Sequence, residues 1–189
     1  MLAGYTRLTR GALSEAEQQE LEQVDALAIL LRDHLDRSEA DINAVHIHGA
    51  QSGDVQRIVA RLLREELGFD EETRFADEIG LTTQVRPDFI FHLDSGRGIL
   101  AEVERGGTTT NNHDLKDFWK THIAPDAQHL FLVVPHANWS AVGKARERPF
   151  IRVSQRLAAF FGEERREVDV VSAHVFGYGN ITLDSPPLA

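Results

Sequence analysis

One apolar run constrains the fold of this chain more than any other feature: His129–Val134, with the sequence His-Leu-Phe-Leu-Val-Val. Strands that are buried on both faces read as unbroken hydrophobic runs, and they occur in sheets that helices cover. The run therefore predicts a central strand in a mixed sheet flanked by helices, which is an α/β fold. The chain of 189 residues is long enough for one domain with a real core, with or without an appendage.

Two more stretches with apolar runs, 86–93 and 99–105, are joined by a short turn that contains glycine, which suits a β-hairpin. Asp88 stands at the start of the first run, and Glu102 and Glu104 lie late in the second. Side chains alternate across a strand, so Glu102 and Glu104 share one face. Carboxylates are rare in buried surroundings unless they are paired or bind metal. The three acids therefore predict a site for a hard divalent cation.

These acids also have a purely structural interpretation. Asp88 could face solvent at the start of a strand, and the two glutamates could line the wet face of an edge strand. There they would pair with Arg86 or Arg105 across the sheet. If the acids converge instead, their negative charges repel one another, and at least one pKa should rise.

The sequences Pro87-Asp88 and Glu102-Val103-Glu104 resemble the motif of the PD-(D/E)xK nuclease superfamily, which has the restriction-endonuclease-like fold. In that motif Pro-Asp lies on one strand, and an acid, any residue and usually Lys lie on the next. Glu104 stands in place of the Lys, as it does in some restriction enzymes of the superfamily. The resemblance covers about residues 50–135, where the predicted order of elements matches the αβββαβ core of that family.

The resemblance implies a divalent-metal-dependent DNA phosphodiester hydrolase, an endonuclease of the restriction type with an Asp/Glu/Glu site. Asp88 and Glu102 would bind Mg²⁺ or Mn²⁺, with Glu66 from the helix before the sheet as a further ligand. Glu104 would orient or deprotonate the attacking water, or help to bind a second cation. A lysine from the helix after the hairpin would supply the missing positive charge. The expected catalytic residues are Asp88, Glu102, Glu104 and Lys116, with Lys120 as the alternative lysine; a solvated helix surface is the other interpretation of Glu66 and of each lysine.

The net charge of −10 opposes simple binding to DNA, but the charge is unevenly distributed. Residues 14–41 carry a local net charge of −7, whereas residues 144–156 carry +4. The basic stretch either contacts the DNA backbone or forms a solvated entry to a helix. The residues expected to bind nucleic acid are Arg105, Lys116, Lys120, Lys144, Arg146, Arg148 and Arg152.

Ser14 and Glu17 form a capping-box pattern, which predicts a helix from there to about residue 37. The apolar stripe of this helix suits either a face buried in its own domain or a short coiled-coil seam. A homodimer joined by this helix would bring two sites to two DNA strands. We expect an N-terminal helical appendage at 1–43, a nuclease-like α/β domain at 44–180 and a tail at 181–189.

Periodicity and turn residues place the remaining elements. Helices are predicted from Gly53 to a left-handed cap at Gly68, over about 113–122 and over about 150–161, and strands near 73–76 and 168–176. His46 and His48 would share a face if their segment were extended. A His-x-His pair can bind metal, but without a third ligand nearby a structural or solvent-facing role is the alternative.

The chain has no cysteine, so it forms no disulfide or thiolate metal site, which fits a cytoplasmic protein. None of its apolar runs approaches the roughly 20 residues of a membrane span. Two rivals to the endonuclease remain. One is a weak or inactive nuclease-fold subunit that serves as a scaffold in a DNA-processing or defence complex, which the missing Lys favours. The other is an oligomerising protein whose N-terminal helix binds a protein partner.

Overall fold

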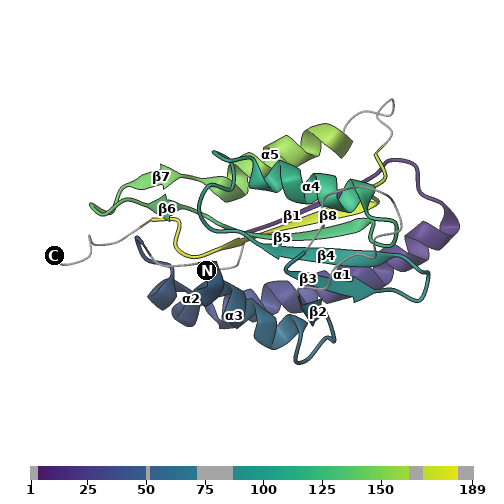
Figure 1. Ribbon diagram of the computed structural model, residues 1–189, viewed down its shortest axis with the longest axis horizontal. Coiled ribbons are helices and arrows are strands. Elements are labelled where there is room, and N and C mark those ends of the chain that lie inside the picture. The colour runs from purple at the N-terminus through teal and green to yellow at the C-terminus, as the bar shows by residue number, and fades with distance from the viewer. Residues whose placement is uncertain (1–3, 50–51, 72–86, 162–167, 183–189) are drawn as a thin grey trace.

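The computed structural model describes residues 4–49, 52–71, 87–161 and 168–182. These residues form a mixed six-stranded sheet with helices on both faces, together with a separate two-stranded hairpin (Figure 1). The predicted α/β class is therefore confirmed. In chain order the elements are β1 (Gly4–Thr9), α1 (Glu15–Arg37), α2 (Glu39–Val45), α3 (Ser52–Leu63), β2 (Asp70–Glu71), β3 (Phe89–His92), β4 (Gly98–Val103), α4 (His113–Ile123), β5 (His129–Pro135), β6 (Asn138–Trp139), β7 (Ala145–Glu147), α5 (Pro149–Phe161) and β8 (Ser172–Tyr178).

The strands of the large sheet follow the order β1-β8-β5-β4-β3-β2. β5 runs parallel to both of its neighbours, β4 and β8, and the other pairs are antiparallel. Every residue of β5 is buried, as its unbroken apolar run predicts. The predicted hairpin is also confirmed, because β3 and β4 pair across a turn in which Gly96 has a φ of 80°.

Helices α1, α2 and α3 cover one face of the sheet, and α4 and α5 cover the other (Figure 1). Alternation along β4 divides its side chains between the two layers. Ile99, Ala101 and Val103 join the core beneath α1 and α3, whereas Leu100 joins the core beneath α4 and α5. Glu102 shares the face of Leu100 and therefore points toward α4.

The N-terminal segment differs from the expected appendage. β1 pairs with β8 at the edge of the sheet, which sequence reasoning did not predict. α1 begins with the predicted capping box: Ser14 Oγ accepts from the Glu17 backbone N–H, and Glu17 Oε2 accepts from the Ser14 N–H at 2.8 Å. Its stripe is buried in the core of the domain, so this stripe is not a surface for the predicted homodimer. The buried stripe residues are Leu21, Val24, Ala28, Leu31 and Leu35.

The other predicted helices correspond to α3, α4 and α5, and Gly68 has the predicted positive φ, at 77°. β8 begins at Ser172, four residues later than expected near 168. The strand predicted near 73–76 and residues 183–189 of the predicted tail lie outside the described residues. Within the described part of the chain, no helix is both long and apolar enough to cross a bilayer.

A chain of hydrogen bonds runs across the sheet beneath α1. Glu20 Oε1 lies 2.6 Å from His129 Nε2, whose Nδ1 lies 2.7 Å from Ser172 Oγ. Ser172 Oγ lies 3.1 Å from His174 Nε2, and His174 Nδ1 lies 2.7 Å from the Tyr5 hydroxyl. A single arrangement of protons makes all four hydrogen bonds: Tyr5 donates to His174, His174 to Ser172, Ser172 to His129 and His129 to Glu20. Polar groups in the interior need such partners, so the chain stabilises the junction of α1 with three strands.

Burial and hydrogen bonds fix the charge of two members of this hydrogen-bonded chain, His174 and Glu20. Burial lowers the pKa of His174 to about 3, because the ring is enclosed between α1 and the sheet. Burial alone would raise the pKa of Glu20, but hydrogen bonds from His129, Ser95 and Arg97 lower it to about 2. The folded state therefore holds a neutral His174 and an ionised Glu20 over a wide pH range.

Acidification should destabilise the fold through His174. This histidine has a pKa near 6.5 in the unfolded chain but about 3 in the folded chain. The stability that the neutral ring contributes is therefore lost as pH falls from 6.5 toward about 3. We expect the free energy of unfolding, measured in urea from about pH 7.5 to 5, to fall more steeply in the wild type than in His174→Gln. The slopes should differ by up to about 1.4 kcal/mol per pH unit below pH 6.5.

The exposed His92 supplies a control, because His92→Gln should retain the wild-type slope. Comparing slopes separates proton binding from the hydrogen bonds that either substitution removes. Equal slopes for His174→Gln and the wild type would show that His174 is protonated alike in the folded and unfolded chains.

Candidate functional site

The β3–β4 hairpin brings Asp88 and Glu102 side by side. In the strand register Phe89 lies opposite Ala101, so the residues that flank this pair, Asp88 and Glu102, are neighbours. The Asp88 backbone N–H donates to Glu102 Oε2 at 3.3 Å, and the Val103 N–H donates to Asp88 Oδ2 at 2.8 Å. The carboxylates thus lock the end of the hairpin, and each is oriented by the backbone of the other strand.

Helix α4 adds a cation, Lys120, and a further acid, Asp117, to this pair. Lys120 Nζ lies 2.7 Å from Glu102 Oε1 and 2.9 Å from Asp117 Oδ1. Glu102 and Asp117 are only 3% and 2% exposed, so one ammonium group serves two buried carboxylates. Asp117 Oδ2 has no hydrogen-bond partner among the described residues. The site is therefore built from three elements, with Lys120 joining the hairpin to the helix.

Burial and mutual repulsion govern the charges here. Burial raises the pKa of Glu102 to about 8, and the negative charges of Asp117 and Asp88 act in the same direction. Burial likewise raises the pKa of Asp117 to about 6, with Glu104 and Asp88 adding to the effect. Burial disfavours a charged Lys120, but the two carboxylates outweigh it and raise the pKa of the ammonium group. A single positive charge cannot neutralise two buried carboxylates, so the pair retains a proton more readily than isolated acids do.

Glu104 lies at the edge of this cluster and contacts α4 at its first residue. Its Oε2 accepts a hydrogen bond from His113 Nδ1 at 2.9 Å. Its backbone is held as well, because its N–H donates to Val133 and its carbonyl accepts from the Tyr178 hydroxyl at 3.0 Å. Glu104 is thus close enough to act electrostatically on Asp117, but its carboxylate is engaged by His113.

Other expected site residues lie apart from this cluster. Lys116 is exposed on α4, and it is Lys120, the alternative lysine, that reaches Glu102. Glu66 is exposed after α3, a helix that covers the opposite face of the sheet, so the structure does not bring it to the acids. Four expected DNA-binding residues, Lys144, Arg146, Arg148 and Arg152, are exposed along the β6–β7 hairpin and the start of α5.

Sequence reasoning missed Asp117 and His113. A signal was available, because Asp117 and Lys120 have the three-residue spacing of an ion pair on one helix face. Lys116 and Lys120, grouped together in the sequence by their four-residue spacing, differ in their surroundings. Lys120 is partly buried against the sheet, and Lys116 faces solvent.

The donor chemistry of the cluster fits a hard divalent cation. Mg²⁺ prefers oxygen ligands and is usually held by one or two carboxylates, with water in its other positions. Asp88 and Glu102 supply such a pair, and the unpartnered Asp117 Oδ2 is a third oxygen nearby. However, within the described ranges no group of three or more His, Asp or Glu residues is arranged to hold a metal ion. A cation bound here would therefore rely on two carboxylates and water.

Comparisons with known proteins give no match: neither a family model nor a curated protein matches this chain. The resemblance to PD-(D/E)xK nucleases remains a prediction from the motif.

The Lys120 ion pairs should matter for stability. Replacing Lys120 with Met leaves Glu102 and Asp117 buried without their shared partner. We expect the free energy of unfolding, measured in urea at neutral pH, to fall by about 1–3 kcal/mol. The matched control is Lys116→Met, the same substitution one helical turn away at an exposed position, which should change stability by no more than about 0.5 kcal/mol. Equal losses in the two variants would show that the ion pairs contribute no more than a surface charge.

Proposed function

We propose that this protein is a divalent-metal-dependent phosphodiester hydrolase that acts on DNA and has a restriction-endonuclease-like core. The observation that carries the proposal is that Asp88, directly before β3, meets Glu102 of β4, and that Lys120 pairs with Glu102. The order of elements adds support. Helix α3 is followed by β2, by the β3–β4 hairpin, by α4 and by β5, and β4 runs parallel to β5. This is the αβββαβ order that the motif implies.

Lys120 supports the proposal even though Glu104 stands in place of the motif lysine. The superfamily motif usually carries its Lys on the same strand as the second acid, where this chain has Glu104. Here an ammonium group reaches that acid from α4 instead. The positive charge is thus supplied from a different element, which is compatible with hydrolysis of a phosphodiester.

Each residue has a defined task in this proposal. Asp88 and Glu102 would hold Mg²⁺ or Mn²⁺ through carboxylate oxygens that the hairpin already orients. The bound cation supplies acidification of water and stabilisation of negative charge on the phosphate. Lys120 orients Glu102 and brings positive charge to the phosphate. Glu104, hydrogen-bonded to His113, would accept a proton from water.

The basic surface near the site favours a nucleic acid. The β6–β7 hairpin extends away from the sheet beside the start of α5 (Figure 1). Its exposed Lys144 and Arg146, with Arg148 and Arg152 beyond it, give residues 144–156 their net charge of +4. Contacts from such side chains to phosphates supply affinity without sequence preference. This local charge offsets the unfavourable net charge of the whole chain.

A second candidate function is a nuclease-fold scaffold without catalysis. It is favoured by the engagement of Glu102 Oε1 by Lys120 and by the lack, among the described residues, of a preformed three-ligand metal group. In this reading the Lys120 ion pairs are purely structural, and the basic hairpin alone contacts DNA or a protein partner.

Nicking of supercoiled plasmid in Mg²⁺ or Mn²⁺ tests the hydrolase. We expect Asp88→Asn and Glu102→Gln each to lower the nicking rate about 100-fold or more, because each removes a positioned charged group from the site. Glu22→Gln, an equivalent change at an exposed position on α1, should retain wild-type nicking.

Calorimetry with Mn²⁺ then separates the two candidates. Binding that is lost in Asp88→Asn and Glu102→Gln supports the metal site. A wild-type protein that neither binds Mn²⁺ nor nicks plasmid is a scaffold. Nicking that persists at full rate in both variants would come from a contaminating nuclease or from another site. Either origin would overturn Asp88 and Glu102 as the active site.

A further inference from the structure

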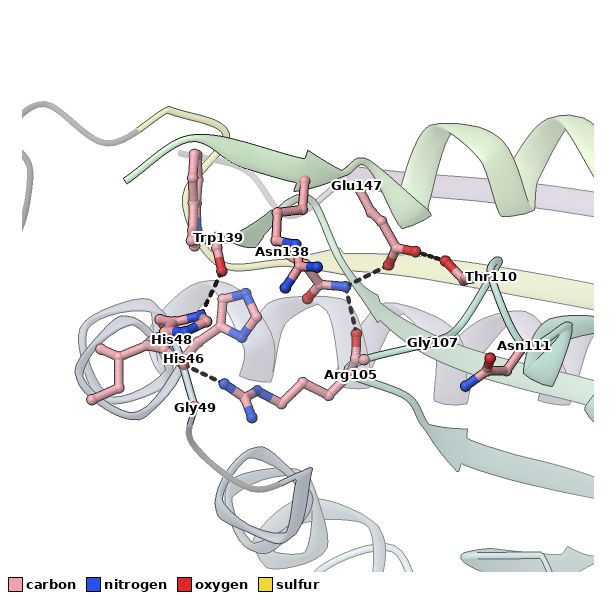
Figure 2. A pocket seen from close by; sticks show the side chains of 13 residues that line it. His46, His48, Gly49, Arg105, Gly107, Thr110, Asn111, Asn138, Trp139 and Glu147 are labelled. Carbon is pink, nitrogen blue, oxygen red and sulfur yellow. Dashed lines mark hydrogen bonds between the residues drawn. The ribbon is translucent and has the colours of Figure 1, made fainter. Parts of the chain in front are cut away.

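A pocket of about 490 Å³ lies beyond the carboxyl end of β4, and Arg105, the residue after Glu104, lines it. Its size is in the range of ligand sites, which is roughly 300–1,000 Å³. Three segments surround it: the 46–49 loop, the 105–111 loop and the β6–β7 hairpin (Figure 2). In open α/β sheets, ligands bind outside the carboxyl ends of parallel strands, which is where this pocket lies relative to β4 and β5.

The pocket is structurally continuous with the candidate site. Arg105 follows Glu104 directly and extends across the pocket toward the 46–49 loop, where its guanidinium donates to the Ile47 carbonyl (Figure 2). The Asn138 side chain on β6 donates to the Arg105 carbonyl at 2.8 Å. The hairpin is therefore anchored to the end of the strand that carries Glu102.

The two histidines of the His-x-His pair, His46 and His48, hold the opposite wall. His46 Nε2 donates to the Ala137 carbonyl at 2.8 Å, and His48 Nδ1 donates to the Trp139 carbonyl at 3.0 Å. Burial lowers the pKa of His46, which favours the neutral ring. Each ring thus ties the 46–49 loop to the β5–β6 segment, which is a structural role and not metal binding.

The lining has the chemistry of a nucleotide site. Arg105 and Arg146 provide two guanidinium groups, and no carboxylate of the described residues forms an ion pair with either. Guanidinium groups match the geometry of phosphate oxygens. Trp139, half-buried at the rim, offers the flat apolar surface on which a base can stack. Asn111 adds an amide that can donate to and accept from a base edge.

The single acid of the lining, Glu147, does not oppose this assignment. Its carboxylate accepts hydrogen bonds from the Thr110 hydroxyl and from the Asn138 amide, at 3.1 Å for the latter (Figure 2). Both oxygens are therefore engaged by the pocket wall. With two arginines and one glutamate, the lining keeps a net positive charge.

We infer that this pocket binds one nucleotide of the DNA strand next to the phosphate that is cleaved, with Arg105 and Arg146 on its phosphate and Trp139 against its base. The inference rests on the proposed function for the identity of the strand, but the binding itself needs neither metal nor hydrolysis. The site would hold the substrate strand in register with Asp88 and Glu102.

Binding of a short, fluorescently labelled single-stranded oligodeoxynucleotide, followed by anisotropy in EDTA, tests the pocket. We expect Arg146→Ala and Trp139→Ala each to weaken binding about tenfold, through loss of a phosphate contact and of base stacking. The matched control is Arg61→Ala, which removes the same side chain from an exposed position on α3, outside the lining, and should leave the affinity unchanged. Lys144 lies on the same hairpin as Arg146 but outside the lining, so equal effects of Arg146→Ala and Lys144→Ala would show a diffuse basic surface and overturn the pocket.

Competition identifies the ligand class. A deoxynucleoside 5′-monophosphate should displace the oligonucleotide at a concentration at least about tenfold lower than inorganic phosphate or the free nucleoside, since only the nucleotide uses both halves of the pocket. Competition by phosphate alone at the same concentration would reduce the site to an anion site and overturn the inference.

The outcome is separable from that of the proposed function. Oligonucleotide binding that depends on Trp139 and Arg146, in a protein that does not nick plasmid, would support the pocket and overturn the hydrolase. Nicking by the wild type, with unchanged binding and nicking in both pocket variants, leaves the hydrolase standing and removes the pocket.

Discussion

The ion pairs of Lys120 are the interaction on which the candidate site depends. They join the end of β4 to α4 through Glu102 and Asp117, and they compensate charges that burial makes costly. Asp88 is then held by the same hairpin end through backbone hydrogen bonds. Without a cation at this position, two buried carboxylates would face each other across the strand and the helix. A protein ammonium group and a metal ion both supply positive charge to buried carboxylates. The site therefore supports both a catalytic and a structural interpretation.

The sheet carries a second polar assembly near the amino ends of β4 and β5, and its chemistry is different. Glu20, His129 and Ser172 are linked in the order acid, imidazole and hydroxyl, as in a nucleophilic triad. Ser172 and His129 are 0% exposed, so a substrate has no access to the hydroxyl. The chain continues through His174 to Tyr5 and satisfies buried donors and acceptors beneath α1. Order of residues alone would suggest hydrolysis by serine, whereas burial assigns these residues to stability.

Much of the fold could be predicted because local patterns are strong where burial is complete. The apolar run of β5, the capping box of α1, and the alternation and glycine turn of the β3–β4 hairpin each reflect one short stretch of sequence. The edge strand β1 and the β6–β7 hairpin could not be predicted in this way. Their residues are only partly buried or exposed, so no clear apolar period marks them, and β1 acquires its partner from β8, far away in the sequence.

The meeting of Asp88 with Glu102 follows from one short stretch of sequence, because a hairpin's register is set by its turn and its alternating side chains. The same stretch surrounds these acids with apolar neighbours. Which cation meets these acids, and which residues of other elements surround them, depends on tertiary packing. The rotation of α4 against the sheet turns Lys120 and Asp117 toward the acids and leaves Lys116 facing solvent. Glu66 is not part of the site, because α3 covers the other face of the sheet. The Arg105 side chain points into the neighbouring pocket. Such choices depend on how separate elements pack, which no single stretch of sequence records.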